Sequence, residues 1–153
     1  MSLYSTLDIS GSGLSAQRRR VEALAQNIAN AETTSTPEGG PYRRRRVIFE
    51  AAPARPSFQD VLREVDPADP SFRIHRALGV KVSRVDVDPT PPERRYEPGH
   101  PDAGPDGYVE YPAFNPVEDM VDLTASVRSY QANLAAIDAV KEMINRTIEI
   151  ARG

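Results

Sequence analysis

No cysteine and no tryptophan occur among the 153 residues of this chain, and aromatic residues make up only 7% of it. The absence of cysteine excludes a disulfide framework and a thiolate metal site. With 39% hydrophobic residues and few large aromatic ones, the chain has little material for a sizeable compact core. We therefore expect partner molecules to supply much of its burial.

Proline is absent from both ends of the chain, since all 14 prolines lie between Pro37 and Pro116. A proline inside a helix removes a backbone donor and clashes with the preceding turn. Both proline-free ends carry aliphatic residues at alternating spacings of three and four, which is typical of helices. The sequence thus predicts an α+β fold in three parts: an N-terminal helical arm over 1–36, a small inserted β-rich and loop-rich domain over 37–114, and a C-terminal helical arm over 115–153.

Signals for a membrane span or for secretion by a cleavable leader are also missing. No run of about twenty apolar residues exists, so we expect no direct membrane insertion. At the start, the apolar residues precede the basic ones, which is the reverse of a cleavable signal peptide. If the protein leaves the cytoplasm, we expect it to use another route.

Chemistry-bearing motifs are scarce. The chain has no phosphate loop and no dinucleotide fingerprint, and the segment Gly11 to Gly13 lies inside a helical pattern, unlike a nucleophile elbow. Of the two histidines, only His100 has carboxylates close by, at Asp102 and Asp106. We interpret it as a loop histidine in a proline-fixed turn rather than a metal ligand. The sequence predicts no enzyme, no cofactor and no metal.

A seam of three-four spacing runs along the N-terminal arm. Its members are Leu3, Leu7, Ser10, Leu14, Gln17, Val21, Leu24, Ile28 and Ala31. Threonines and Pro37 should end this helix near Glu32. Gly11 and Gly13 weaken the helix by about 0.5–1 kcal/mol each, so its first turns should fray in an isolated chain.

The C-terminal arm begins with a clear helix signal. Asn115 can cap the helix, Pro116 suits its first position, and Glu118 follows three residues after the cap. The seam that follows consists of Met120, Leu123, Val127, Tyr130, Leu134, Ile137, Lys141, Ile144, Ile148 and Ala151. We expect the two seams to pair as an antiparallel coiled coil whose free faces meet neighbouring subunits, because the middle of the chain has too little apolar material to cover both helices.

The insert should contain short elements separated by turns. They are a strand over 46–51, a short helix over 58–65, a strand over 79–87 with a bulge where the alternation slips between Ser83 and Val85, and a strand over 108–111. The turn-rich segments PEGGPY and DPTPPERRYEPGHPDAGPDG are predicted to be exposed loops.

Two arginine clusters, at 18–20 and 43–46, raise an alternative: a basic-patch nucleic-acid-binding protein or a coiled-coil adaptor. The first cluster flanks a helical seam and fits a solvated helix face. Arginines of the second alternate on a strand, so they would point to both faces, and some would meet acidic residues such as those of an adjacent subunit. Because no recognition module or interleaved aromatic residues accompany this charge, we expect no nucleic-acid partner.

Several motifs carry a resemblance to a known family. GLSAQ at 13–17 and AQNIANAETT at 25–34 resemble the N-terminal signature of bacterial flagellar rod and hook proteins. PEGGPYRRR at 37–45, GVKV at 79–82, PGHPDA and GYVEYP within 98–112, VEDMVDL, and RSYQANLAAIDAVKEM are similar to one member, a proximal rod subunit. The resemblance covers nearly the whole chain, and residues 51–78 contribute least.

The resemblance implies a structural subunit of the flagellar basal body that polymerises through its terminal helices into the proximal rod. It implies export through the flagellar type III apparatus without a cleavable signal peptide, and assembly in the periplasm. The implied partners are copies of the chain, other proximal and distal rod subunits, and the adapter protein FliE.

The resemblance also suggests that amides in the two arms contact adjacent subunits, since unpaired polar groups are costly in a tightly packed tube. The predicted assembly interface is the following set: Leu7, Leu14, Val21, Leu24, Asn27, Ile28, Asn30, Met120, Leu123, Val127, Tyr130, Asn133, Leu134, Ile137, Ile144 and Ile148.

Overall fold

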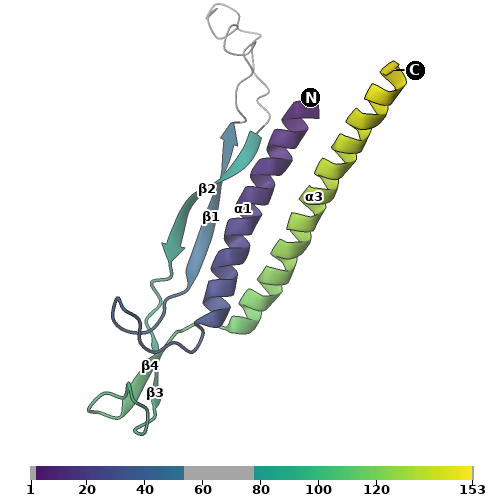
Figure 1. Ribbon diagram of the computed structural model, residues 1–153. Coiled ribbons are helices and arrows are strands. Elements are labelled where there is room, and N and C mark those ends of the chain that lie inside the picture. The colour runs from purple at the N-terminus through teal and green to yellow at the C-terminus, as the bar shows by residue number, and fades with distance from the viewer. Residues whose placement is uncertain (1–2, 54–77, 153) are drawn as a thin grey trace, which may run out of the picture.

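A computed structural model describes residues 3–53 and 78–152. The chain begins with one long helix, α1 (Leu3–Ala29), and ends with another, α3 (Pro116–Arg152). Between them in the sequence lie two separate two-stranded antiparallel sheets (Figure 1). The first sheet pairs β1 (Arg45–Pro53) with β2 (Leu78–Val87), and the second pairs β3 (Glu93–Tyr96) with β4 (Tyr108–Tyr111). This confirms the predicted α+β class. The predicted helix over 58–65 lies outside the described residues.

Side-chain hydrogen bonds mark the start of α3 and the end of α1. The side-chain oxygen of Asn115 accepts a hydrogen bond of 3.0 Å from the backbone N–H of Val117, and Pro116 takes the first helical position, as predicted. At the other helix, α1 ends at Ala29 and the chain turns through 30–32. The side-chain amide of Asn30 donates 2.8 Å to the Gln26 carbonyl, which also accepts the backbone N–H of Asn30 at 3.1 Å.

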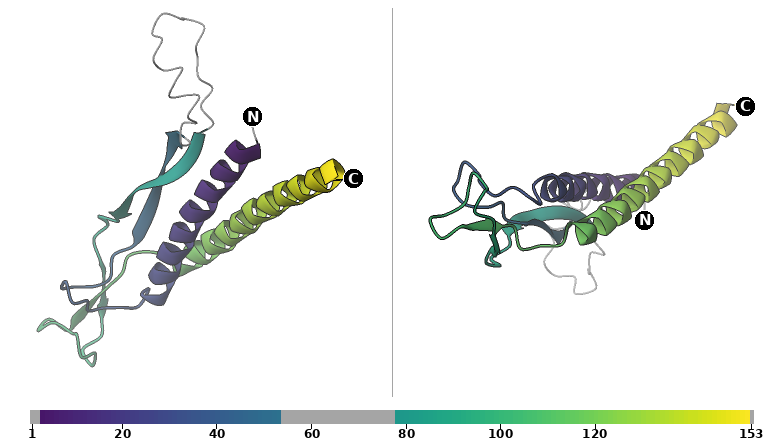
Figure 2. Two further views of the ribbon diagram at one scale, coloured as in Figure 1. Left: turned by 45° about the horizontal axis from the view of Figure 1, so that its top comes forward. Right: turned by 90° about the horizontal axis from the view of Figure 1, so that it is seen from below.

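The two helices run antiparallel and side by side, and they separate toward the C-terminal end of α3 (Figure 2). Two contacts fix their register. Asn27 of α1 lies opposite Asp119 of α3, and two heptads away Gly13 lies opposite Asn133. At Gly13 the backbones come close, because an added Cβ would lie 3.0 Å from the Nδ2 atom of Asn133.

The row of α3 that faces α1 differs from the predicted seam. Its buried members, Asp119, Ser126 and Val140, and the half-buried Asn133 repeat at heptad spacing and are mostly polar. Antiparallel pairing of the arms is therefore present. Polar residues share the contact with apolar ones, since Leu123, Ile137 and Ile144 of the predicted seam are half-buried. The predicted seam contains none of the four residues that repeat at heptad spacing in this row. Hydropathy selects apolar positions, so it does not reveal a contact row that is mostly polar.

The sheet of β1 and β2 packs against α1, on a different side from α3 (Figures 1 and 2). The Ser12 hydroxyl accepts a hydrogen bond of 3.1 Å from the backbone N–H of Val80. A Cβ at Gly79 would lie only 2.7 Å from that hydroxyl oxygen, so the close approach depends on this glycine. The predicted bulge is confirmed, since Ile48 pairs with Arg84 and Phe49 with Val82, which leaves the intervening residue of β2 unpaired.

The sheet of β3 and β4 corrects one expectation. The segment DPTPPERRYEPGHPDAGPDG contains a strand, β3, where a continuous loop was predicted. All four of its side chains are exposed, so no alternation of apolar and polar residues marks it in the sequence. Instead, arginines lie over tyrosine rings: Arg94 over Tyr108 at 4.9 Å, and Arg95 over Tyr111 at 4.7 Å.

Buried hydrophobic side chains are few in the described part of the chain. They are Ala16, Ala23, Leu24, Tyr42, Val109 and Val140. Large apolar side chains on α3 are exposed instead, among them Met120, Val127, Leu134, Met143, Ile148 and Ile150. Neither described helix combines the length and apolar character that a membrane span requires. The expectation of a small core is confirmed for these residues, and a long apolar face is left without a cover inside the chain.

Candidate assembly surface

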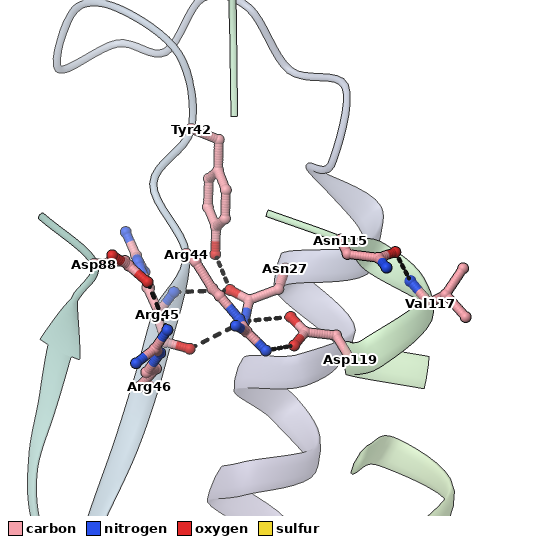
Figure 3. A network of polar contacts seen from close by, with 9 residues as sticks. All are labelled: Asn27, Tyr42, Arg44, Arg45, Arg46, Asp88, Asn115, Val117 and Asp119. Atoms are coloured by element: carbon pink, nitrogen blue, oxygen red, sulfur yellow. Dashed lines mark hydrogen bonds and ion pairs between the residues drawn. The ribbon is translucent and has the colours of Figure 1, made fainter. Parts of the chain in front are cut away.

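A buried polar network holds the junction of α1, β1 and α3 (Figure 3). At its centre is Asn27, whose side chain is fully buried. Its Nδ2 donates to the Arg45 carbonyl at 3.0 Å and to an Asp119 carboxylate oxygen at 2.9 Å. Its Oδ1 accepts 2.9 Å hydrogen bonds from the Tyr42 hydroxyl and from the Arg45 backbone N–H. Both donors and both acceptor sites of this amide are thus used within the chain.

An ion pair completes the network. The guanidinium of Arg44 donates to the second carboxylate oxygen of Asp119, which has no exposed surface. Asp119 lies in the first turn of α3, where the helix dipole favours negative charge. Burial raises the pKa of the Tyr42 hydroxyl, nearby Arg45 lowers it, and Asp119 raises it further. A buried ion pair contributes little net stability but is costly to break, so this network fixes how α3 leaves the insert.

These contacts give the three amides of the predicted interface a role within the chain. Asn27 was predicted to contact adjacent subunits, but its hydrogen-bonding capacity is already satisfied inside the chain. Asn30 is half-buried, and its side chain closes the end of α1 through Gln26 and through the Thr33 hydroxyl at 3.2 Å. Asn133 lies between the two helices, with its amide against Gly13.

Part of the predicted apolar set occupies the side of the helix pair away from β1 and β2. Because α1 and α3 are antiparallel, the residues that follow Asn27 and Asp119 point to the same side of the pair. Accordingly, Ile28 and Met120 line one cleft together. Steps of seven along each helix extend this side as two rows, which we call the outer face. Its members are Leu7, Leu14, Val21 and Ile28 of α1, and Met120, Val127 and Leu134 of α3.

Exposure differs between the rows. On α1 the four outer-face residues are half-buried, and Leu24 lies deeper, at 7% exposure. On α3, exposure is 49% for Met120 and 44% for Leu134, whereas Leu123, Ile137 and Ile144 turn partly toward α1. Tyr130 is at the boundary with 36%, and Ile148, beyond the helix contact, has 45%. The outer face is therefore apolar along both helices, half-buried on α1 and exposed on α3.

Sequence reasoning missed Tyr42, Arg44 and Asp119. A usable signal was present: Asp119, Ser126 and Asn133 repeat at seven-residue spacing one position before the apolar row. A polar row beside an apolar row on a long helix indicates two different partners. The neighbouring sequence does not tell which partner each row contacts. Asp119, for example, pairs with Arg44, which is 75 positions away.

Four arginines of the two clusters form ion pairs within the chain. Arg18 and Arg19 contact Glu22 at 2.9 and 3.5 Å. In the second cluster, Arg46 pairs with Asp88 at 2.8 Å. The acidic neighbours of these arginines therefore come from the same chain.

The candidate metal ligands do not converge either. His100 Nδ1 accepts a hydrogen bond of 3.1 Å from the Asp102 backbone N–H, while the Asp102 carboxylate accepts one of 2.6 Å from Thr34. Asp106 pairs with Arg94 instead. Within residues 3–53 and 78–152, no three potential metal ligands come together.

Two family models match the two segments that build the helix pair. The model described as "Flagella basal body rod protein" matches residues 7–35, and the model described as "Flagellar basal body rod FlgEFG protein C-terminal" matches residues 106–150. The first segment contains Asn27 and the second contains Asp119, so both ends of the buried network lie in matched regions.

Similar proteins match over the full length. A flagellar basal-body rod protein FlgC of Borreliella burgdorferi is 37% identical, covering 100% of both chains. FlgC proteins of Bacillus subtilis and Salmonella typhimurium are 36% and 35% identical, each over 99% of this chain and 100% of the relative. The chain therefore belongs to the FlgC family of flagellar basal-body rod proteins, the structural subunits of the rod.

Proposed function

We propose that the chain polymerises into the proximal part of the rod through the outer face of its terminal helices. The observation that carries this proposal is the exposed apolar stripe on α3, from Met120 through Val127 to Leu134. Contiguous exposed apolar surface on a soluble chain marks an interaction site. Covering it is favourable by about 25 cal/mol for each Å² removed from water.

The three parts of the chain then have separate roles. We assign assembly to the arms over 1–36 and 115–153, and positioning within the rod to the insert over 37–114. The buried network of Asn27 and Asp119 supports this division, because it joins both arms to the insert and leaves the outer face open. Leu24, Leu123, Ile137 and Ile144 support the face from beneath, and Tyr130 and Ile148 extend it.

Family membership supports self-assembly with other rod components. We further propose that the partners include proximal and distal rod subunits, the adapter FliE and, during secretion, the flagellar type III export apparatus. The proposed location is the part of the rod that crosses the periplasm. A structural role without catalysis agrees with the bonds that Arg18, Arg46 and His100 make to groups of the same chain.

The test places a carboxylate in the stripe. Leu134→Asp or Leu14→Asp should prevent rod assembly and abolish motility, because each would bury an unpaired charge at the interface. Ala132→Asp, at an exposed position of α3 outside the outer face, is the matched control and should assemble. Circular dichroism of the purified variants should show unchanged β-structure. Normal rods from both leucine variants would contradict the proposal.

A further inference from the structure

The segment Gly11 to Gly13 is a weak stretch of α1 by its local chemistry. Both glycines lower the helix propensity. Between them, the Ser12 hydroxyl donates a hydrogen bond of 2.7 Å to the Ile9 carbonyl, a bond that competes with the helical ladder. α1 nevertheless runs from Leu3 through this segment without interruption. Contacts with other elements therefore supply the order that the local sequence does not.

Three successive residues of this turn face three different neighbours, because adjacent side chains on a helix point about 100° apart. Ser12 contacts β2, and Gly13 contacts α3. Leu14, the next residue, belongs to the outer face. The order of this one turn therefore determines where α1 lies on the sheet, how closely it approaches α3, and where Leu14 points.

The contact of Ser12 with β2 is close and specific. Its hydroxyl oxygen accepts a hydrogen bond of 3.1 Å from the backbone N–H of Val80, so the hydroxyl is used both as donor and as acceptor. A Cβ at Gly79 would lie 2.7 Å from this oxygen, which is closer than non-bonded atoms pack. The approach of β2 to α1 therefore requires glycine at this position.

Ser12 and Asn27 both bind α1 to the backbone of the sheet. Asn27 bonds to the backbone of Arg45 in β1, whereas Ser12 bonds to the backbone of β2. The two points are about 22 Å apart along the helix. Between them, the Arg20 guanidinium lies over the Phe49 ring, 5.8 Å from its centroid. Asn27 thus anchors the last turns of α1, and Ser12 anchors its first half.

We propose that Ser12 and Gly79 are positioning residues through which the insert orders the first half of α1. We call their contact the α1–β2 lock. Through it, Leu7 and Leu14 take their places in the outer face within the single chain, before a second copy is met. The insert thereby helps to build the assembly surface. For the outer face this inference rests on the proposed function, whereas the lock itself belongs to the isolated chain.

Amide hydrogen exchange of the purified chain tests the lock, with peptides from residues 3–13 and 20–28 followed separately. Gly79→Ala should raise the exchange rate of 3–13 about tenfold or more, because the added methyl group overpacks the contact, and should leave 20–28 unchanged. Gly99→Ala is the matched control, since Gly99 has open space around its missing Cβ. An unchanged rate in 3–13, or an equal rise in both peptides, would overturn the inference.

The sign of the effect of Ser12→Ala distinguishes a locked from an unlocked α1. Alanine is the better helix former, so exchange of 3–13 would slow if there were no lock. With the lock, loss of the bond to Val80 should speed it about two- to fivefold. The exposed Ser15→Ala is the control and should not speed exchange. Adding Ser12→Ala to Gly79→Ala removes the crowded oxygen, so the double variant should exchange more slowly than Gly79→Ala alone. Slower exchange in Ser12→Ala than in the unmodified chain would contradict the lock.

A disulfide offers a reversible form of the lock, because the chain has no cysteine of its own. In Ser12→Cys with Gly79→Cys, the two Cβ atoms would lie 3.3 Å apart, near the range of about 3.5–4.5 Å found in disulfides. Oxidation of the purified chain should join the two cysteines within one chain and slow the exchange of 3–13, and reduction should reverse this. Ser12→Cys with Gly99→Cys, in the loop between β3 and β4, should form no such bond. Absence of the intramolecular bond in the 12–79 pair would contradict the close approach.

Rod assembly separates the inference from the proposed function. Gly79→Ala should reduce rod formation and motility, because Leu7 and Leu14 depend on the lock, whereas Gly99→Ala should assemble normally. Normal rods from Gly79→Ala in spite of faster exchange would overturn the role of the lock in the outer face. Failure of the proposed function would appear instead as normal rods from both Leu14→Asp and Leu134→Asp, whatever the exchange rates.

Discussion

Asn27 of α1 donates a 2.9 Å hydrogen bond to the carboxylate of Asp119 in the first turn of α3, and neither side chain is exposed to solvent. This bond joins two segments that are 92 positions apart in the sequence. It fixes the register of the two arms and thereby determines which helix rows face outward. The assembly surface therefore depends on a contact that lies inside the subunit.

Removal of the Asn27 amide should destabilise the isolated chain. Asn27→Ala leaves the Asp119 carboxylate, the Tyr42 hydroxyl and two backbone groups of Arg45 without this partner, at a cost of about 2–4 kcal/mol in the free energy of unfolding. Urea unfolding of the purified chain measures this. The exposed Asn145→Ala is the control and should change stability by less than about 0.5 kcal/mol. Equal unfolding midpoints for the two variants would contradict an internal role for Asn27.

The ion pair of Arg44 with Asp119 should show strong coupling. Arg44→Met leaves a buried carboxylate unpaired and should cost about 3–5 kcal/mol. Adding Asp119→Asn removes that charge while keeping an acceptor for Asn27, so the double variant should be more stable than Arg44→Met alone. Arg43→Met, at the exposed neighbouring position, controls for loss of a cation. Additive effects in the double-mutant cycle would count against the pair.

The two glycines of α1 should respond differently to alanine. Gly11 has open space around its missing Cβ, so Gly11→Ala should stabilise the helix by about 0.5–1 kcal/mol. At Gly13 the new methyl group would meet the Asn133 amide at 3.0 Å, which offsets that gain. Thermal unfolding of the two variants should therefore give a higher melting temperature for Gly11→Ala. The reverse order would show that α1 and α3 do not approach at Gly13.

Alkaline pH should lower the stability of the folded chain through the Tyr42 hydroxyl, which belongs to the buried network at the junction of α1, β1 and α3. Burial raises the pKa of its hydroxyl above the ordinary value of 10.0. Between pH 10 and that raised pKa, the unfolded chain has lost the Tyr42 proton while the folded chain retains it, so stability falls as pH rises. Below pH 10 this contribution is fully present. The slope of unfolding free energy against pH in this range should be shallower in Tyr42→Phe, and Tyr130→Phe is the matched control. An unchanged slope in Tyr42→Phe would exclude the hydroxyl as its source.

The sequence was sufficient for features with local causes. Proline placement and three-four spacing predicted both helices, Asn115 and Pro116 marked where α3 begins, and the slip in alternation near Ser83 located the bulge. Each of these follows from interactions over a few residues. Elements with that kind of signal can be read without knowledge of the fold.

Features that depend on distant partners could not be predicted in the same way. The strand β3 consists of exposed residues held by cross-strand pairing and by arginine–tyrosine contacts, so no hydropathy pattern marks it. The polar row that begins at Asp119 becomes a helix contact only because Asn27 and Arg44 reach it from elsewhere. The assembly interface stays a prediction, and the face on which its apolar residues lie became visible only with the register of the two helices.

The most direct test of the account is a density map of the assembled rod at side-chain resolution. We predict that Val127 and Leu134 lie within about 4.5 Å of apolar atoms of an adjacent subunit. Asn27 should keep all its hydrogen bonds within its own chain. A map in which the outer face borders solvent, or in which Asn27 bonds to a neighbouring subunit, would contradict the account.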